Sequence, residues 1–452
     1  MIRRPAVAPL VLAVLAALGA PPARAADGTL DPAFWGDGRY VGSAAPDEAF
    51  LSGALAAPDG ALVYYGSRRS TSQPVQYVPR WRRLTDGVES GCDLVLAGGV
   101  QGTLVGATFD AAGRLVVGGW AQMPDLTYRL LFARYFYPSC ALDTGFDGDG
   151  VAILDVGAPE IASVMALAAE GDALVFVANV RLAGATDRDA LVGRLLASGA
   201  PDPSFSGDGF YPFDGRAGDD DLNKVVLAPG GRIYAGGLGW LPDGSHADFY
   251  LLALQDNGTP VPGFGLDGLV TVDFGATTGD PSDYFYDLAL MPDGRLLLAG
   301  EATVDVAPGY AGALAMITPA GTLDAAFGTG GRLIDASRGL YERVAVQGNG
   351  RILIGAIDFP SSAYYVSRRL AADGAPDPTF AGGASVPVTF AEGGYHEIAD
   401  LLLQDGRVVV AGFLERNAPD LDLAALARLK NTYVFADGFE TGATWFWSVA
   451  AP

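Results

Sequence analysis

A strand-turn-strand motif recurs along this chain at nearly constant spacing, and no other feature of the sequence constrains the fold as strongly. Typical copies read APDGALVYYG, MPDGRLLLAG and LQDGRVVVAG. The seven copies begin at Ala57, Asp110, Ala169, Ala228, Met291, Gln347 and Leu403. Six periods separate the turn residues Gly60 and Gly406, so the mean period is about 58 residues. Asp-Gly, Asn-Gly and Gly-Gly supply the positive φ angles of tight turns, and the flanking apolar runs predict β-strands.

Each period has room for two more short strands, as in GFYPFDG at Gly209 and DFYLLALQDNG at Asp248. Four strands per repeat and no helical periodicity predict an all-β fold, a single β-propeller of about seven four-stranded blades. Eight or six blades are the alternatives, because the second repeat is degenerate. A blade cannot bury both faces alone, so neighbouring blades must stack and close into a ring.

A second motif precedes most hairpins, and we expect it to lead the chain from one blade to the next. Its copies are LDPAFWGDG at Leu30, LDTGFDGDG at Leu142, PDPSFSGDG at Pro201, VPGFGLDG at Val261, LDAAFGTGG at Leu323 and PDPTFAGG at Pro376, with a degenerate copy around CDLVLAGGV at Cys92. We call it the Asp-Phe loop. The recurrent phenylalanine is interpreted as a plug between blades, with a sugar-binding aromatic ring as the alternative.

Five arginines follow the hairpin turns: Arg114, Arg232, Arg295, Arg351 and Arg407. We expect each to pair with a nearby carboxylate or loop carbonyl, and the alternative is a ring of anion ligands. The two motifs together, with closing strands such as LFARY at Leu131, resemble the delta-60 repeat of bacterial exported and surface proteins. The resemblance covers about residues 30 to 430. It implies a repeat fold and no particular active site.

The termini differ from the repeats. Arg3 and Arg4, the apolar run VAPLVLAVLAALG and the small residues of ARA predict a secretory signal peptide over 1–25. The propeller then occupies 26–430, and 431–452 form a C-terminal tail. FADGFETGATWFWS in this tail is similar to a short tail of various secreted bacterial proteins, which implies export or surface retention. Packing of its aromatic residues on the last blade is the alternative.

Charge and cysteine usage restrict the location and partners. The net charge is −23, which disfavours nucleic acid and anionic lipids as partners. No apolar run after the signal segment is long enough to span a membrane. Cys92 and Cys140 are the only cysteines, and in an exported chain they predict a disulfide between adjacent blades, close to the axis.

The sequence names no catalytic or cofactor motif. His246 and His396 lack metal-ligand spacing, and neither a nucleophile elbow nor a phosphate loop occurs. Asp143, Asp147 and Asp149 resemble the start of a calcium loop, but Gly145 and Leu154 stand where ligands belong. We therefore expect no cofactor, with weak Ca²⁺ binding as the alternative, and a structural loop here.

These features predict a secreted or cell-surface monomer, with the periplasm as the alternative location. We expect a non-catalytic binding or surface scaffold for an extracellular or cell-envelope ligand, either glycan or protein. A hydrolase or lyase acting at the mouth of the central channel is the alternative, which buried carboxylates or histidines at the axis would favour. The longest departures from the repeat, 67–87 and 238–249, supply the candidate ligand contacts Tyr77, Trp81 and Trp240.

Overall fold

The computed structural model describes residues 27–42, 48–69, 76–85, 87–215, 218–275, 281–305, 309–337, 339–358, 361–391, 396–417 and 420–431. The predicted signal segment and the tail beyond residue 431 lie outside the described residues, so both remain predictions.

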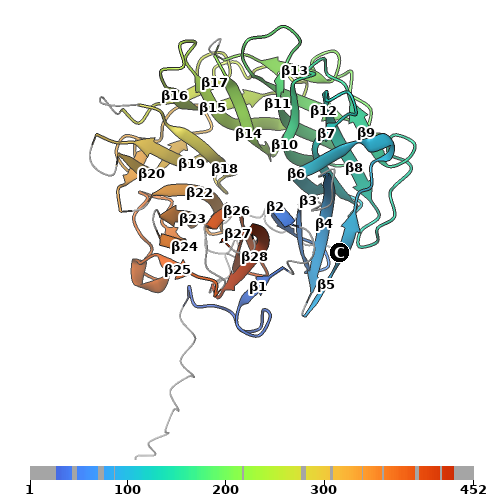
Figure 1. The fold of residues 1–452 in the computed structure, drawn as a ribbon. Helices are drawn as coiled ribbons and strands as arrows, with labels where there is room; N and C mark the ends of the chain where they lie inside the picture. Colours follow the sequence, from blue (N-terminus) through green and yellow to red (C-terminus); the bar gives the residue numbers. More distant parts are fainter. Residues whose placement is uncertain are drawn as a thin grey trace, which may run out of the picture.

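Seven four-stranded antiparallel sheets form a ring, as predicted (Figure 1). We number the blades 1 to 7 by their innermost strands. These are β2 (Glu48–Ala56), β6 (Gln101–Phe109), β10 (Ile161–Glu170), β14 (Asp220–Ala228), β18 (Tyr284–Leu290), β22 (Leu340–Val346) and β26 (His396–Gln404). The second strands are β3 (Leu62–Arg69), β7 (Leu115–Gln122), β11 (Ala173–Arg181), β15 (Arg232–Trp240), β19 (Leu296–Thr303), β23 (Ile352–Asp358) and β27 (Arg407–Asn417).

The outer half of each blade contains the third and fourth strands. The third strands are β4 (Tyr77–Thr85), β8 (Tyr128–Tyr135), β12 (Asp189–Leu195), β16 (Ala247–Leu254), β20 (Tyr310–Ile317), β24 (Ser361–Arg369) and β28 (Asp420–Leu429). The outermost strands are β5 (Val88–Asp93), β9 (Val151–Leu154), β13 (Phe210–Phe213), β17 (Leu269–Val272), β21 (Arg332–Asp335), β25 (Val386–Val388) and, in blade 7, β1 (Arg39–Val41). Two short 3₁₀ turns, η1 (Ala97–Gly99) and η2 (Ala381–Gly383), are the only helical elements of the described chain.

The middle strands of most blades are rich in buried apolar residues because neighbouring blades cover both of their faces. All eight residues of β16 are buried, for example. The faces of these sheets pack against one another in a ring of apolar clusters, each shared by two adjacent blades, as in the cluster that joins Phe249 of blade 4 to Phe285 of blade 5. This shared burial is what a single blade could not achieve.

The ring is closed by a strand from the beginning of the described chain. β1 pairs with β28, with Arg39 opposite Ala427 and Val41 opposite Ala425. Blade 7 therefore combines residues 39–41 with residues 396–429, and its edge is not left open.

The position predicted for the Asp-Phe loops was wrong. Five copies connect the third strand of a blade to the outermost strand of the same blade, as 142–150 does between β8 and β9. The copy at Leu30 directly precedes β1, the outermost strand of blade 7. The crossing between blades comes later, after the outermost strand. In blade 1 no such loop exists, because β4 and β5 form a tight hairpin with Thr85 opposite Val88. The expected degenerate copy is instead the end of β5 and the crossing to blade 2.

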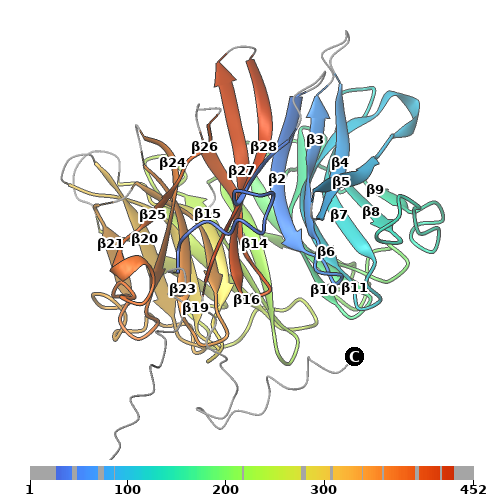
Figure 2. The same cartoon turned by 90° about the horizontal axis from the view of Figure 1, so that it is seen from below.

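The strand order separates the loops into two faces (Figure 2). The hairpin turns and the Asp-Phe loops share one end of the ring, which we call the repeat face. The turns between second and third strands and the crossings between blades share the other end, the crossing face. No helix in the described part of the chain has the length and apolar character needed to cross a membrane.

Candidate functional site: the axial channel

All seven innermost strands carry a β-bulge at the same position, where one extra residue interrupts the pairing with the second strand. The extra residues are Ser52, Val105, Met165, Asn223, Tyr286, Glu342 and Ala399. Bulges re-aim side chains, and here they bring two successive residues of most innermost strands to the axis. The ring thus has a band of non-alternating residues around its centre.

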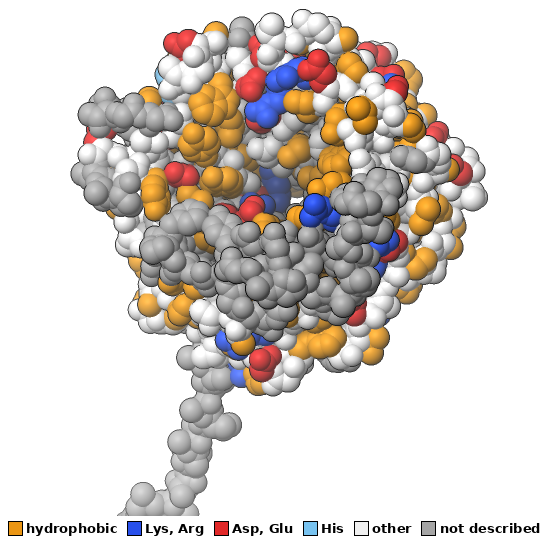
Figure 3. All heavy atoms as spheres, viewed as in Figure 1, with side chains coloured by type: hydrophobic (Ala, Val, Ile, Leu, Met, Phe, Trp, Pro, Cys, Tyr) orange, Lys and Arg blue, Asp and Glu red, His pale blue; other side chains and the backbone are white. Residues whose placement is uncertain are grey.

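A cavity of about 350 Å³ lies within this band. Residues from all seven innermost strands line it, together with Tyr65 of β3. Figure 3 shows a hollow at the middle of the ring with Lys or Arg side chains (blue) inside it. Cavities of this size hold small organic ligands in many proteins.

The two sides of the channel differ in chemistry. The residues that follow the bulges are Gly53, Gly106 and Ala166 in blades 1 to 3, and Lys224, Asp287, Arg343 and Asp400 in blades 4 to 7. We call the latter four the charged arc. Its charges alternate in sign from blade to blade, and the facing wall is small and apolar. Sequence inspection missed this arc, although Lys224, Asp287 and Arg343 each stand seven residues before a turn glycine.

The charged groups of the arc interact with one another, and these interactions affect the pKa values of Lys224 and Asp400. Lys224 Nζ lies 3.1 Å from Asp287 Oδ1 of the next blade. Burial lowers the pKa of Lys224, but Asp287 and Asp400 outweigh that effect and the pKa is raised. Burial raises the pKa of Asp400, against the opposing influence of Lys224 and Arg343.

Glutamates of blades 5 to 7 surround Tyr286 near the charged arc. Burial raises the pKa of Glu301 to about 7, although a hydrogen bond from Tyr286 opposes the rise. Burial also raises the pKa of Glu342 to about 7, and that of Glu397, while Arg343 opposes both shifts. The pKa values of Glu301 and Glu342 lie near neutral pH, which is the range that acid-base chemistry uses.

Two groups of three aspartates lie where successive blades meet at the crossing face. Asp189, Asp214 and Asp220 form one group, and Asp248, Asp273 and Asp283 form the other; within each, one oxygen per residue lies within 4.8 Å of the others. Oxygen ligands of this kind suit Ca²⁺ or Mg²⁺. The loop at Asp143, which resembles the start of a calcium loop in sequence, differs because arginines already contact its carboxylate.

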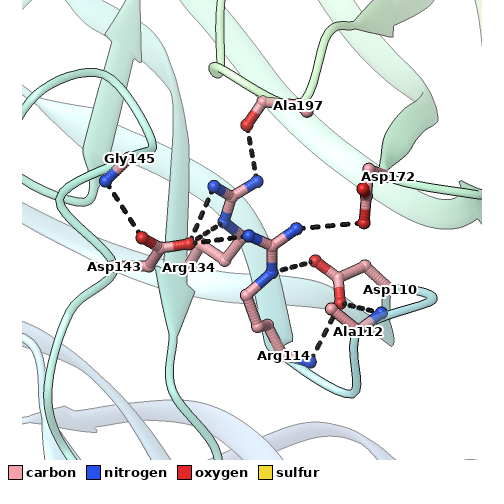
Figure 4. A network of polar contacts seen from close by, with 8 residues as sticks. All are labelled: Asp110, Ala112, Arg114, Arg134, Asp143, Gly145, Asp172 and Ala197. Carbon is pink, nitrogen blue, oxygen red and sulfur yellow. Dashed lines mark hydrogen bonds and ion pairs between the residues drawn. The ribbon is translucent and has the colours of Figure 1, made fainter.

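On the repeat face, Asp143 accepts hydrogen bonds from Arg134 Nε at 2.8 Å and Arg114 Nη1 at 3.0 Å (Figure 4). Arg114 also pairs with Asp110 and with Asp172 of the next blade. The turn arginines Arg295, Arg351 and Arg407 contact Asp324, Asp377 and Asp31 in the same way. Arg232 instead donates to the Tyr234 hydroxyl. The expected structural role of these arginines is confirmed for the four that pair with carboxylates.

The phenylalanines of the Asp-Phe loops are plugs between blades, as expected. Phe146 of blade 2 is fully buried. A Cβ atom on Gly199 of blade 3 would lie 3.1 Å from its ring, so the two blades meet there in close contact. Gly258 meets Phe205 in the same way at the next boundary. Buried rings of this kind leave no aromatic surface for a sugar.

Cys92 and Cys140 form a disulfide with their Cα atoms 5.7 Å apart. It joins blades 1 and 2 at the outer rim rather than near the axis, because Cys92 lies in the outermost strand β5 and Cys140 in the loop after β8. This is the boundary at which blade 1 lacks an Asp-Phe loop. Trp81 fills the space there, with its ring centroid 5.7 Å from that of Tyr135.

The three candidate ligand contacts differ in burial and lie at different boundaries between blades. Trp81 is 1% exposed, so its side chain offers no surface to a ligand. Tyr77 is half-buried and contacts Trp120 of blade 2, whereas Trp240 contacts Tyr284 at the boundary of blades 4 and 5. None of the three lines the axial channel.

The histidines do not share a site either. His246 lies in the turn between β15 and β16 of blade 4. His396 begins β26 of blade 7, and its side chain is outside the described residues.

Comparisons with known proteins agree with the fold. A family model described as a domain of unknown function, the DUF5122 β-propeller, matches residues 292–327. No curated protein sequence matches the chain. The chain is similar to a polysaccharide lyase, Uly1, with 12% identity, a TM-score of 0.48 and coverage of 87% of this chain and 91% of that chain.

Two other solved structures are similar to a comparable degree. The β-propeller domain of the Trilobed protease from Pyrococcus furiosus has 11% identity, a TM-score of 0.42 and coverage of 88% of this chain and 98% of that chain. The endosialidase of phage phi92 has 13% identity, a TM-score of 0.42 and coverage of 90% and 71%. With TM-scores below 0.5, these likenesses carry no inference about ligand or activity.

Proposed function

We propose that this protein is an exported, non-catalytic binding protein whose ligand is held in the axial channel. The observation that carries the proposal is the lining of the cavity. Three residues of the charged arc, Lys224, Arg343 and Asp400, line a cavity of about 350 Å³ together with an apolar wall, and such a combination of apolar surface with a few fixed polar groups is typical of ligand sites. The ligand is the end of a glycan, a side chain of a partner protein, or a small molecule of similar size.

Export is supported by the disulfide, because structural disulfides persist in oxidising compartments. The signal-type sequence over 1–25 points the same way. The acidic surface, with a net charge of −23, favours solubility of a monomer outside the cell.

A hydrolase or lyase is the second candidate, and the carboxyl groups around Tyr286 favour it. Glu301, with a pKa of about 7, would be partly protonated at neutral pH and could donate a proton to a leaving group. Glu342 is a weaker candidate because it is 5% exposed and its Oε2 accepts a hydrogen bond from the Ile398 N–H. The binding function is preferred because no motif supplies a nucleophile.

The experiment is a binding screen that compares the protein with a variant whose channel is blocked. The purified protein is screened against glycans and cell-envelope fractions, in parallel with glycosidase, lyase and esterase substrates. Val105→Trp fills the channel, and Val95→Trp makes the same change at a residue that is 83% exposed and outside the channel. We expect Val105→Trp to abolish binding of the ligands found and Val95→Trp to preserve it.

Two outcomes would contradict the proposal. Ligands that bind Val105→Trp as tightly as the unmodified protein would place the site elsewhere. Substrate turnover that is lost in Glu301→Gln would establish the enzymatic alternative.

A further inference from the structure

The four residues of the charged arc are not equally available to a ligand. Asp287 is 2% exposed. Its Oδ2 accepts a hydrogen bond from the Val344 N–H of the next blade at 2.9 Å, and its Oδ1 accepts one from the Leu288 N–H. This carboxylate is therefore part of the wall, where it links blades 5 and 6.

Asp400 has a similar arrangement. Its Oδ2 accepts a hydrogen bond from the Ala54 N–H of blade 1 at 3.3 Å, and its Oδ1 accepts one from the Leu401 N–H at 2.9 Å. The carboxylate oxygens of both acidic residues in the arc thus accept hydrogen bonds from backbone N–H groups. The negative charge in the channel is fixed to the protein.

The two cations are more available. The side chain of Lys224 is 32% exposed, and because it lines the channel that exposed surface faces the cavity. Arg343 donates from Nε to the Ala399 carbonyl and from Nη1 to the Glu342 carbonyl, both at 2.6 Å. Backbone carbonyls hold this guanidinium in place without neutralising it, and the ion pairs among the described residues do not include it.

The rarity of lysine in this chain supports a specific role for Lys224 in the channel. The chain contains only two lysines, Lys224 and Lys430, against 27 arginines. An ammonium group is a compact point charge with three donors, suited to a single anionic group in a confined space. Next to Lys224 along the ring, blades 2 and 3 line the cavity with the apolar side chains of Val105, Met165 and Leu167.

We propose that the channel binds a small organic anion, whose carboxylate or phosphate group lies between Lys224 and Arg343 and whose apolar body packs against Val105, Met165 and Leu167. This inference rests on the proposed binding function and names its ligand class. The net charge of the protein repels anions only weakly at the channel, because physiological salt screens exposed charges beyond about 8 Å. The enclosed cations interact with an anion at a much lower effective dielectric constant.

The test uses a matched series of probes that share a six-carbon chain. Hexanoate and hexyl phosphate carry an anion, hexylammonium carries a cation, and 1-hexanol carries no charge. Binding is measured by ligand-observed NMR at one ionic strength. We expect both anions to bind and the cation and the alcohol to bind at least about tenfold more weakly, since charge-assisted hydrogen bonds to Lys and Arg are missing.

Lysine variants test the site. Lys224→Met keeps the length of the side chain and removes its charge, and Lys430→Met is the matched control outside the channel. Because Lys224→Met leaves the buried Asp287 without its cation, the double variant Lys224→Met with Asp287→Asn keeps the wall neutral. Hexanoate affinity should fall at least about tenfold in both channel variants and stay unchanged in Lys430→Met.

The outcomes distinguish this inference from the proposed function. Hexylammonium binding as tightly as hexanoate, or full hexanoate affinity in the double variant, would overturn the anion site. If Val105→Trp blocks ligands from the screen while hexanoate does not bind, channel binding stands and only the anion class is wrong. If hexanoate binds Val105→Trp as it binds the unmodified protein, its site lies outside the channel and the anion inference is wrong. Both proposals are wrong if the ligands found in the screen also bind Val105→Trp with full affinity.

Discussion

Arg134 lies over the ring of Phe146, with its guanidinium carbon 4.9 Å from the ring centroid. The same arginine donates from Nε to Asp143 of its own blade and from Nη1 to the Ala197 carbonyl of the next blade. One side chain therefore fixes the Asp-Phe loop and attaches it to its neighbour. Arg194 over Phe205 and Arg428 over Phe34 repeat the arrangement around the ring.

Phe146→Ala should destabilise the protein by about 3 to 5 kcal/mol, because it removes a fully buried ring from the boundary between two blades. Urea unfolding followed by circular dichroism measures the loss. Phe136→Ala is the control, since that ring is 50% exposed and its removal should cost less than about 1 kcal/mol. Equal effects of the two substitutions would show that Phe146 is not a plug.

Gly199 should tolerate alanine less well than Gly148. Both have a φ of +87°, so alanine pays about 1 to 2 kcal/mol for the left-handed conformation at either position. Only at Gly199 does the new Cβ meet the Phe146 ring, at 3.1 Å, whereas nothing lies within 4 Å at Gly148. The difference between the two unfolding free energies isolates the contact between blades. No difference would contradict the close packing described above.

Removal of the disulfide should destabilise the protein by about 2 to 4 kcal/mol, because the bond closes a loop between residues 48 positions apart. The variant is Cys92→Ser with Cys140→Ser, compared by thermal unfolding. A reducing agent should lower the midpoint of the unmodified protein toward that of the variant. A midpoint that does not respond to reduction would mean that the bond is absent or contributes no stability.

Asp283 should make stability depend on pH. Burial, and then the neighbouring carboxylates of Asp273 and Asp248, raise its pKa to about 7, although backbone hydrogen bonds oppose the rise. The folded state then holds this proton more tightly than the unfolded state, so Asp283 reduces stability as the pH rises from about 4 to about 7.

Asp283→Asn cannot ionise and should gain stability relative to the unmodified protein between pH 5 and pH 8. The measurement is the free energy of unfolding of both proteins at the two pH values, with EDTA present so that no divalent cation neutralises the carboxylates. A difference that is the same at both pH values would show that Asp283 ionises normally.

The sequence was sufficient for the hairpins and the blade number, because turn residues and apolar runs are local signals. It did not reveal which strands share a sheet. β9 has only four residues and follows a loop, so nothing local assigns it to the blade before it rather than the one after it. The position of the disulfide was misjudged for the same reason.

The channel was missed because its residues are ordinary when viewed singly. Lys224, Asp287 and Arg343 become a site only through a bulge that repeats in every innermost strand and through closure of the ring. Aromatic residues predicted to contact a ligand, such as Trp81, pack between adjacent blades instead. Aligning the repeats on their turn glycines places Lys224, Asp287 and Arg343 in one column, seven residues before the glycine, where blades 1 and 2 have Gly53 and Gly106.

The assignment of the Asp-Phe loop to the interior of a blade has a consequence for how such a chain can evolve. A duplicated stretch of about 58 residues that begins at such a loop carries one outermost strand and three strands of the following blade. Inserted at any other copy of the loop, it completes the blade before it and leaves its own blade to be completed by the next copy. The number of repeats can therefore rise or fall by recombination while every sheet keeps four strands. The reason is that the recombination junction falls within a hydrogen-bonded sheet and not between sheets.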